Sequence, residues 1–480
     1  MSPQNTSYLR PDEPRSFASV NPRSLLAFVE PPKHLTLYPP SPPVHARGTR
    51  TIKSLDNNMD EWEVTTHVIP AAYPRGTPLV RLSSRHAQAT EPLTKEARAK
   101  QMEQTALDLI EFKHRSVRGE DCGGSMEEEP SRVLWNVVNR YVKLGKSRNI
   151  RRGTKDITLL LTHPTGFPKE IWEPFIQQLT HALLPSDVCV AEIWSLEAVQ
   201  HGDAALLNEG HLGDLYDWAD NSRDILNFLL NYLPDIRDPH LSSSNSSRCP
   251  AHLPRLSDEV VSKRRSGGFD DRILVAIGHS FGGCTATLAA LTHPSLFSSL
   301  ILVDPVITAP WIVRATHLKT MVLGAIRRRA VWDSREEARR LFAANPFFAA
   351  WDPKVLDTYV EHGLVQDVAN EKFVLKTPAR QEGVCFTEVR VGCEVFELLP
   401  TLDPRIEVRW ILAGKDLEMS VTGDVQTTAE LVWRRPMNAS NVRIGSSGHL
   451  VAQEAPAELA RDVCDFMTRK YKDANGKARL

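Results

Sequence analysis

Residues 271–284 read DRILVAIGHSFGGC, an apolar run followed at once by a serine among glycines. An apolar run over 273–277 ends at the pentapeptide 278–282, which fits the pattern G-x-S-x-G. The pattern belongs to a strained turn from strand to helix that presents a serine hydroxyl above a sheet, with glycines where the backbone is crowded. Because an apolar strand precedes the turn and an Ala-rich segment follows it, Ser280 is predicted to be a nucleophile rather than an ordinary turn residue.

Apolar runs of strand length recur along the chain from residue 156 onward. They occupy 157–163, 187–194, 272–277, 296–305, 406–414 and 441–449. Helical patterns alternate with these runs, for example over 218–233 and 283–291. Near-continuous hydrophobicity marks strands that are covered on both faces. The sequence therefore predicts an α/β fold with a mostly parallel central sheet flanked by helices.

Three segments stand apart from this pattern. Residues 1–58 are rich in Pro, Ser and Arg without periodicity, which predicts a disordered leader before one domain over 59–480. Residues 240–268 are polar and turn-rich, which predicts a flexible insertion. Residues 306–400 are mostly helical in pattern, so we expect a helical cap inserted between the last strands; within it, arginines 327–329 are expected to form the solvated end of a helix.

The overall composition argues against several functions. The 58 basic and 59 acidic residues give a net charge of −1, which offers no reason to expect binding of nucleic acid or an anionic membrane. Seven dispersed cysteines argue against a disulfide framework and against zinc. No apolar stretch approaches the ~18 residues of a membrane span, and the N-terminus lacks the apolar core of a signal peptide. We expect a soluble protein without a metal or organic cofactor.

A serine nucleophile needs a histidine base and a carboxylate that orients it. His449 lies between the last strand and the last helix, where the chain order Ser…acid…His puts the base. Two carboxylates qualify as the acid, because each follows a predicted strand and would lie at the upper edge of the sheet: Asp304 and Asp416. The residue pattern by itself leaves both open.

The oxyanion of an acyl-transfer intermediate needs backbone N–H donors. Phe281 is predicted to supply one of them, because it follows the nucleophile. The loop over 163–167, reading HPTGF, is predicted to supply the other. Since Pro164 has no N–H, Thr165 is the expected donor, with Gly166 as the alternative.

Six motifs together resemble the α/β-hydrolase superfamily, and more narrowly the fungal peroxisomal-lipase-like hydrolases, including those of toxin biosynthesis clusters. They are HPTGFPKEIWEPF (163–175), EIWSLEAVQHGD (192–203), LNEGHLGDLYDWADNSRDILNFL (207–229), GHSFGG (278–283), LILVDP (300–305) and GSSGHL (445–450). The resemblance covers roughly residues 60–470 and implies the α/β-hydrolase fold. It favours Asp304 as the acid, because relatives carry an acidic residue before Pro-Val, as Asp304-Pro305-Val306 does. Pro164 departs from the common His-Gly form of the oxyanion loop.

The predicted function is that of a serine hydrolase cleaving a carboxylic ester or thioester of an apolar acyl or polyketide-like substrate, in peroxisomal secondary metabolism. The alternatives are an acyltransferase of the same fold and a non-catalytic binding protein. The tripeptide Ala478-Arg479-Leu480 resembles an address read by the peroxisomal import receptor; otherwise a cytoplasmic location is expected. The aromatic residues of the cap would suit an apolar acyl group; they are Trp311, Trp332, Phe342, Phe347, Phe348 and Trp351.

Overall fold

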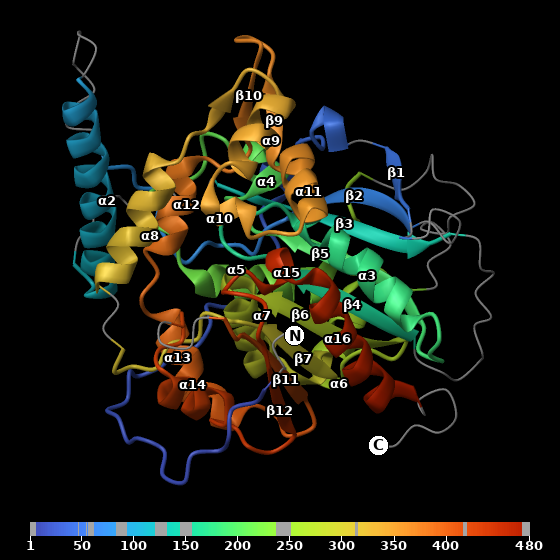
Figure 1. Cartoon of the computed structure of the whole chain (residues 1–480). Coiled ribbons are helices and arrows are strands. Elements are labelled where there is room, and N and C mark those ends of the chain that lie inside the picture. The colour runs from blue at the N-terminus through green and yellow to red at the C-terminus, as the bar shows by residue number, and fades with distance from the viewer. Residues whose placement is uncertain are drawn as a thin grey trace.

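A nine-stranded sheet runs through the protein in the order β1-β2-β3-β5-β4-β6-β7-β11-β12 (Figure 1). The computed structural model describes residues 6–46, 48–53, 55, 62–82, 94–120, 132–144, 156–236, 251–312, 315–415 and 420–472. The strands are β1 Thr49–Ile52, β2 Trp62–Pro70, β3 Trp135–Lys143, β4 Asp156–Thr162, β5 Val190–Glu197, β6 Arg272–His279, β7 Ser299–Val303, β11 Glu407–Ala413 and β12 Ala439–Ile444. Neighbours from β5 to β12 pair in parallel, whereas β1, β2 and β3 add antiparallel pairs. The predicted α/β fold is confirmed.

Side chains of the central strands alternate between two apolar cores. In β4, Leu159 and Leu161 join the core on one face, while Leu160 joins the core on the other. All three are fully buried. Because successive side chains of a strand point to opposite faces, a strand that is apolar throughout requires cover on both sides.

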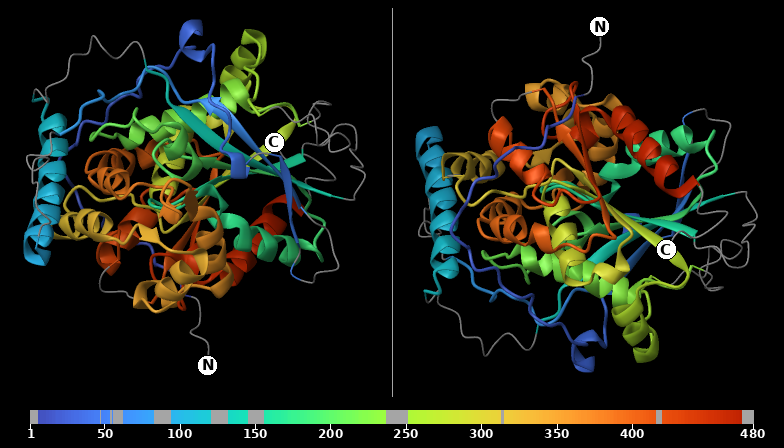
Figure 2. Two further views of the ribbon diagram at one scale, coloured as in Figure 1. Left: turned by 90° about the horizontal axis from the view of Figure 1, so that it is seen from above. Right: turned by 90° about the horizontal axis from the view of Figure 1, so that it is seen from below.

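Helices supply that cover on the two faces of the sheet (Figure 2). The helices α3 Glu173–Leu183 and α16 Pro456–Tyr471 pack together and share one core. The helices α5 Trp218–Asn227 and α7 Phe281–Thr292 pack together and share the other. The remaining elements outside the cap are α1 Lys33–Thr36, η1 Val44–Ala46, α2 Lys95–Val117, η3 Lys169–Trp172, α4 Gly202–Leu207, η4 Phe228–Tyr232, α6 Asp258–Gly267, η7 Pro294–Leu296, η8 Leu399–Thr401, α14 Val425–Val432 and α15 Val451–Glu454.

The cap lies between β7 and β11 in the chain, as the sequence predicts, and its middle part, residues 335–375, lies above the sheet in Figure 1. It contains α8 Ala315–Arg327, β8 Val331–Trp332, α9 Arg335–Ala343, α10 Pro346–Ala349, α11 Pro353–Gly363, β9 Leu364–Asp367, β10 Lys372–Leu375, α12 Ala379–Phe386 and α13 Val391–Leu398. The small antiparallel sheet β8-β10-β9 is missing from the prediction. Its strands have only two to four residues, too few to show an alternating pattern.

The N-terminal segment differs from the predicted leader. Residues 6–46 run along the domain rather than away from it, as the blue trace in Figure 1 shows. Thr6 forms an antiparallel bridge with Arg443 at the edge of β12, and Tyr8 is buried. Arg23 forms ion pairs with Glu394 and with Asp217, both at 2.7 Å. The composition of this segment shows that it cannot form a hydrophobic core of its own. It does not show that a few separate contacts can hold the segment against the rest of the domain.

Three further predictions concern residues that the structure describes only in part or not at all. Within the predicted insertion 240–268, residues 251–268 are described and contain α6, which Ser257 caps through its side chain. Residues 240–250 lie outside the described ranges, as do Asp416 and the tripeptide 478–480. In the part of the chain that is described, no helix combines the length and the apolar character needed to cross a bilayer.

Candidate active site

Ser280 occupies a strained turn between β6 and α7. Its backbone angles are φ +55° and ψ −119°, which a residue with a side chain adopts only when its surroundings impose them. The glycines beside it allow this close packing. A β-carbon on Gly282 would lie 2.4 Å from the carbonyl oxygen of Thr162, and one on Gly278 would lie 2.7 Å from the Cα of Gly283. The sequence motif therefore forms the sharp strand-to-helix turn that it predicts.

A chain of two hydrogen bonds connects Ser280 to a carboxylate. His449 Nε2 lies 3.0 Å from Ser280 Oγ, and His449 Nδ1 lies 2.6 Å from Asp304 Oδ2. Because a carboxylate only accepts, Nδ1 carries the ring proton and donates it to Asp304. Nε2 is thereby left as the acceptor for the serine hydroxyl, which is the arrangement of a general base.

Asp304 is held at the end of β7 by backbone contacts as well. Its N–H donates to the carbonyl of Ile411 at 2.8 Å, and its Oδ1 accepts from the N–H of Ala413 at 3.1 Å. The side chain is buried, and φ is +36°. Both carboxylate oxygens thus have fixed partners. Of the two acids left open by the sequence pattern, Asp304 contacts His449, whereas Asp416 falls outside the described residues.

His279 is a residue of this site that the sequence analysis does not assign. Its ring is buried at the end of β6, and Nε2 donates to the backbone carbonyl of His449 at 2.8 Å. Burial, and then the neighbouring His449, lower the pKa of His279 to about 3, so the ring is neutral at ordinary pH. His279, the residue just before the serine in G-x-S-x-G, thereby holds the loop that carries His449 in place. Sequence spacing gives no signal for this role.

The predicted oxyanion loop lies against the start of α7. Thr162 Oγ1 donates to the carbonyl of Gly282 at 3.0 Å, so the end of β4 is fastened beside Phe281. Within the loop, Gly166 has φ +90°, and a β-carbon there would lie 2.7 Å from Glu382 Oε1. Thr165 is buried, and its hydroxyl lies 3.5 Å from the Cys385 thiol. Thr165 and Phe281 are thus on neighbouring segments, as a shared oxyanion hole requires.

His163 supports the first half of this loop. Its Nε2 accepts from the N–H of Ala198 at 3.0 Å, and its Nδ1 donates to the carbonyl of Pro164 at 2.8 Å. Burial lowers the pKa of His163 to about 4, which keeps the ring neutral. Through these two hydrogen bonds, the neutral ring of His163 links the loop to the residues after β5.

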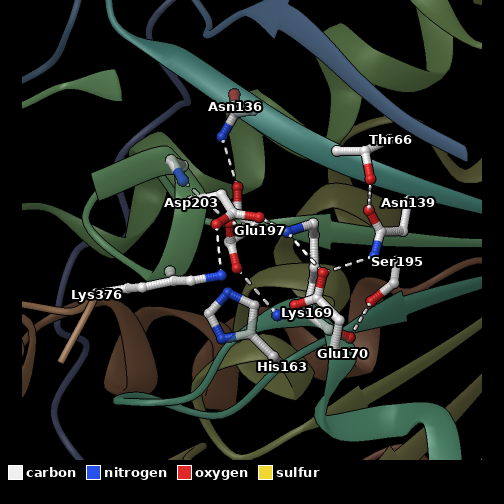
Figure 3. Close-up of polar contacts among 12 residues, drawn as sticks. Thr66, Asn136, Asn139, His163, Lys169, Glu170, Ser195, Glu197, Asp203 and Lys376 are labelled. Atoms are coloured by element: carbon white, nitrogen blue, oxygen red, sulfur yellow. Dashed lines mark hydrogen bonds and ion pairs between the residues drawn. The ribbon is translucent and has the colours of Figure 1, made fainter. Parts of the chain in front are cut away.

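A buried charge network supports the second half of the loop (Figure 3). Lys169 Nζ lies 2.7 Å from Asp203 Oδ2, 2.9 Å from Glu170 Oε1 and 3.4 Å from Glu197 Oε2. Lys376 Nζ lies 2.7 Å from Asp203 Oδ1. All five side chains are almost completely buried. Charges so deeply buried are tolerated only when they are paired and hydrogen-bonded, and these are.

The backbone of Lys169 is held by the same network. Its N–H donates to Glu197 Oε1 at 3.0 Å, and its carbonyl accepts from Ser195 Oγ at 2.9 Å. Since Lys169 follows the loop by two residues, these bonds fix where the loop ends. Burial lowers the pKa of Lys169, but the carboxylates of Asp203, Glu170 and Glu197 together outweigh that effect, and the net shift is upward. The only sequence signal for the network is a Lys-Glu pair within an otherwise apolar stretch.

Cap residues pack directly on the oxyanion loop. The Phe167 ring lies 5.4 Å from the ring of Trp351 and 5.6 Å from that of Tyr359. The aromatic residues expected to line an acyl site divide into three groups: Trp332, Phe342, Phe348 and Trp351 are buried in the cap with Tyr359, Phe347 is exposed, and Trp311 packs against Phe17 and Phe396. Most of the set therefore forms the core of the cap. Among the described residues, no group of His, Cys, Asp or Glu is arranged to hold a metal ion.

Comparisons with known proteins place these features in a wider group. A family model described as "Alpha/beta hydrolase family" matches residues 159–462. The abhydrolase domain-containing protein ACTT2 of Alternaria alternata is 38% identical over 226 residues, which are 41% of this chain and 83% of that protein. The type I acyl-CoA thioesterase mpaH of Penicillium brevicompactum is 30% identical over 208 residues, which are 43% of this chain and 39% of the thioesterase. The match thus spans well under half of the thioesterase.

One solved structure resembles this chain over most of its length. The peroxisomal α/β-hydrolase Lpx1 of Saccharomyces cerevisiae superimposes with a TM-score of 0.57, covering 87% of this chain and 93% of that one. Sequence identity over the superposition is 17%, so the likeness concerns the fold alone.

Proposed function

The chain belongs to the α/β-hydrolase family, and from that premise we propose that it is a serine hydrolase of carboxylic ester or thioester bonds. The observation that carries the proposal is the chain of hydrogen bonds from Ser280 through His449 to Asp304, 3.0 and 2.6 Å long. A serine with a strained backbone, a neutral acceptor nitrogen and a buried carboxylate are the three parts that acyl transfer needs.

In the proposed reaction, Ser280 Oγ attacks the carbonyl carbon while its proton passes to His449 Nε2. The imidazolium formed is stabilised by Asp304, which stays ionised. Backbone N–H groups of Phe281 and Thr165 donate to the oxyanion of the tetrahedral intermediate. His449 then gives its proton to the leaving alcohol or thiol, and a water molecule activated by the same nitrogen releases the acyl group.

The relatives support a narrower substrate class. One relative is named an acyl-CoA thioesterase, and another is an abhydrolase-domain protein. An acyl thioester of apolar or polyketide-like character is therefore the proposed substrate. A third relative, LPX1 of Saccharomyces cerevisiae, is named a peroxisomal membrane protein and is 29% identical over 167 residues, which are 35% of each chain. We extend the proposal to a peroxisomal location, with the import receptor as partner.

Turnover of p-nitrophenyl esters and acyl-CoA thioesters by purified wild-type protein and by Ser280→Ala tests the proposal. Loss of a triad member leaves only the residual catalysis of the oxyanion hole and of binding, so a decrease in kcat of about 10³-fold or more is expected. Ser262→Ala, at an exposed serine of α6, is the matched control and should keep the wild-type rate. If Ser280→Ala retains the wild-type rate, the proposal is wrong.

A further inference from the structure

Polar side chains with unsatisfied hydrogen-bonding atoms gather where the cap meets the oxyanion loop. They are Gln200 and His201 after β5, Arg328 after α8, and Tyr359 in α11. Gln200, His201 and Tyr359 are fully buried. Within the described part of the chain, both amide atoms of Gln200, both ring nitrogens of His201, the Tyr359 hydroxyl and the Arg328 Nε have no hydrogen-bond partner. These four residues are called the cap–core polar cluster below.

On the core side, the cluster borders both proposed oxyanion donors. The His201 ring stacks on the Phe281 ring, with centroids 6.2 Å apart and planes 20° apart. The amide of Gln200 lies beside the Cys385 thiol, which in turn lies 3.5 Å from the Thr165 hydroxyl. Phe281 and Thr165 are the two residues whose backbone N–H groups are assigned to the oxyanion. Gln200 and His201 thus lie next to the two residues that are assigned to the oxyanion hole.

On the cap side, the cluster borders the oxyanion loop, residues 163–167. The Arg328 Nη1 donates to Glu382 Oε1 at 3.1 Å, and this oxygen lies against Gly166. The Tyr359 ring packs on Phe167. Burial, then the neighbouring His163 ring and the Arg328 guanidinium, lower the pKa of His201, so Arg328 and His201 face one buried region. The expectation that arginines 327–329 form a solvated helix end holds for Arg327 and Arg329, which are exposed, but not for Arg328, which turns inward.

The chemistry of the cluster decides what it would bind. Arg328 is already paired with Glu382, so the ion pair as a whole is neutral. His201 is neutral as well, which leaves one ring nitrogen as donor and one as acceptor. The free groups are then mainly N–H and O–H donors, with a few acceptors, and no net charge. Such a set matches hydroxyl or keto oxygens rather than a second ion. A plain hydrocarbon chain would leave every one of these groups unsatisfied, which is costly.

We propose that the cap–core polar cluster is a subsite for the acyl part of the substrate, and that the acyl chain carries a hydroxyl or keto oxygen close to the scissile carbonyl group. The inference rests on the proposed hydrolase function and specifies its substrate class. It also explains why the cap places Arg328 and Tyr359, rather than apolar side chains alone, on the oxyanion loop.

A matched set of thioesters tests this inference: decanoyl thioester, its hydroxydecanoyl positional isomers and the corresponding oxodecanoyl compounds. The wild-type protein is expected to show kcat/KM at least about 10-fold higher for one oxygenated compound than for decanoyl, because a site built to hydrogen-bond a hydroxyl rejects the analogue that lacks it. Tyr359→Phe and Gln200→Met should reduce this ratio to within about threefold of unity. The loss in both variants should fall mainly on kcat/KM for the oxygenated compound, because only that compound uses the deleted hydrogen bonds, whereas general loss of structure would lower kcat/KM for both compounds alike.

Tyr232→Phe is the matched control, because Tyr232 is a buried tyrosine of η4, outside the cluster, and its variant should keep the wild-type ratio. The inference is overturned if wild-type protein favours decanoyl, or if both cluster variants keep the wild-type ratio. Reaction of Ser280 with a fluorophosphonate separates the two levels of the account. A labelled, active protein without preference for oxygen overturns the subsite alone, whereas a protein that neither labels nor hydrolyses overturns the proposed function and the subsite with it.

Discussion

Replacement of Asp304 by asparagine tests the geometry of the site in detail. The two side chains have nearly the same shape, but the carboxylate accepts through both oxygens, from His449 Nδ1 and from the N–H of Ala413. An asparagine has one oxygen only. With that oxygen facing the N–H of Ala413, its amide NH₂ points at His449 Nδ1. The imidazole must then carry its proton on Nε2, where it can no longer accept the proton of Ser280.

The expected loss follows from this reversed tautomer. Disabling the orienting acid of a Ser-His-Asp set by Asp→Asn lowers kcat by about 10⁴-fold. We expect about 10³- to 10⁴-fold for Asp304→Asn, which corresponds to about 4–5 kcal/mol of transition-state stabilisation. KM should change little, because the carboxylate does not contact substrate.

The assay is steady-state hydrolysis of the best ester or thioester, with thermal unfolding measured in parallel. Tm should remain near the wild-type value, since the substitution conserves volume and one of the two hydrogen bonds. Asp416→Asn is the matched comparison and is expected to change kcat by no more than a few fold. If Asp304→Asn is nearly as active as wild type while Asp416→Asn is not, the assignment of the acid is wrong.

Four further outcomes are expected. Gly282→Ala should lower Tm and kcat, because the new β-carbon would meet the carbonyl of Thr162 at 2.4 Å; unchanged kinetics would show that the turn is not crowded. Burial lowers the pKa of His279 to about 3 from an ordinary value of 6.5, so below pH 6.5 the unfolded chain binds a proton that the folded chain does not. The free energy of unfolding of the wild-type protein should be highest above pH 6.5 and lower by about 2–3 kcal/mol at pH 4.5. In urea unfolding, His279→Gln should lose less of this free energy between pH 8 and pH 4.5 than the wild-type protein does; equal losses in the two proteins would refute the prediction. Lys169→Met removes the ion-pair partner of the buried Glu170 and Glu197 and should cost about 3–5 kcal/mol in urea unfolding; a cost below about 1 kcal/mol would mean that the network does not depend on Lys169. Deleting residues 478–480 should disperse a peroxisomal signal of a fluorescent fusion, and retention of that signal would remove the peroxisomal proposal.

Much of the fold follows from local pattern. The uninterrupted apolar run before Ser280 predicts a strand covered on both faces, and the structure buries β6 in that way. The predicted nucleophile, acid and base follow the strands β6, β7 and β12, whose carboxyl ends lie at one edge of the sheet. A parallel sheet brings the ends of its strands together, so chain order predicts that Ser280 and His449 lie close to one another and to a carboxylate, but it does not choose between Asp304 and Asp416.

Features that depend on pairing across the fold could not be predicted in this way. Lys169 and Arg328 look like surface residues in the sequence, because nothing local reveals that Asp203 or Glu382 will face them. The N-terminal segment lacks any periodic pattern, yet Tyr8 and Arg23 fasten it to distant parts of the chain. Such contacts join residues that lie far apart in the chain, so the sequence around each residue does not reveal them.

The central claim is that Ser280 is an activated nucleophile, and covalent labelling measures this most directly. Folded protein is treated with a fluorophosphonate, and the modified residue is identified by peptide mass spectrometry. The account predicts one label per chain, located at Ser280, and a loss of labelling in His449→Ala. A folded protein in which Ser280 stays unmodified, or in which another residue carries the label, would contradict the account.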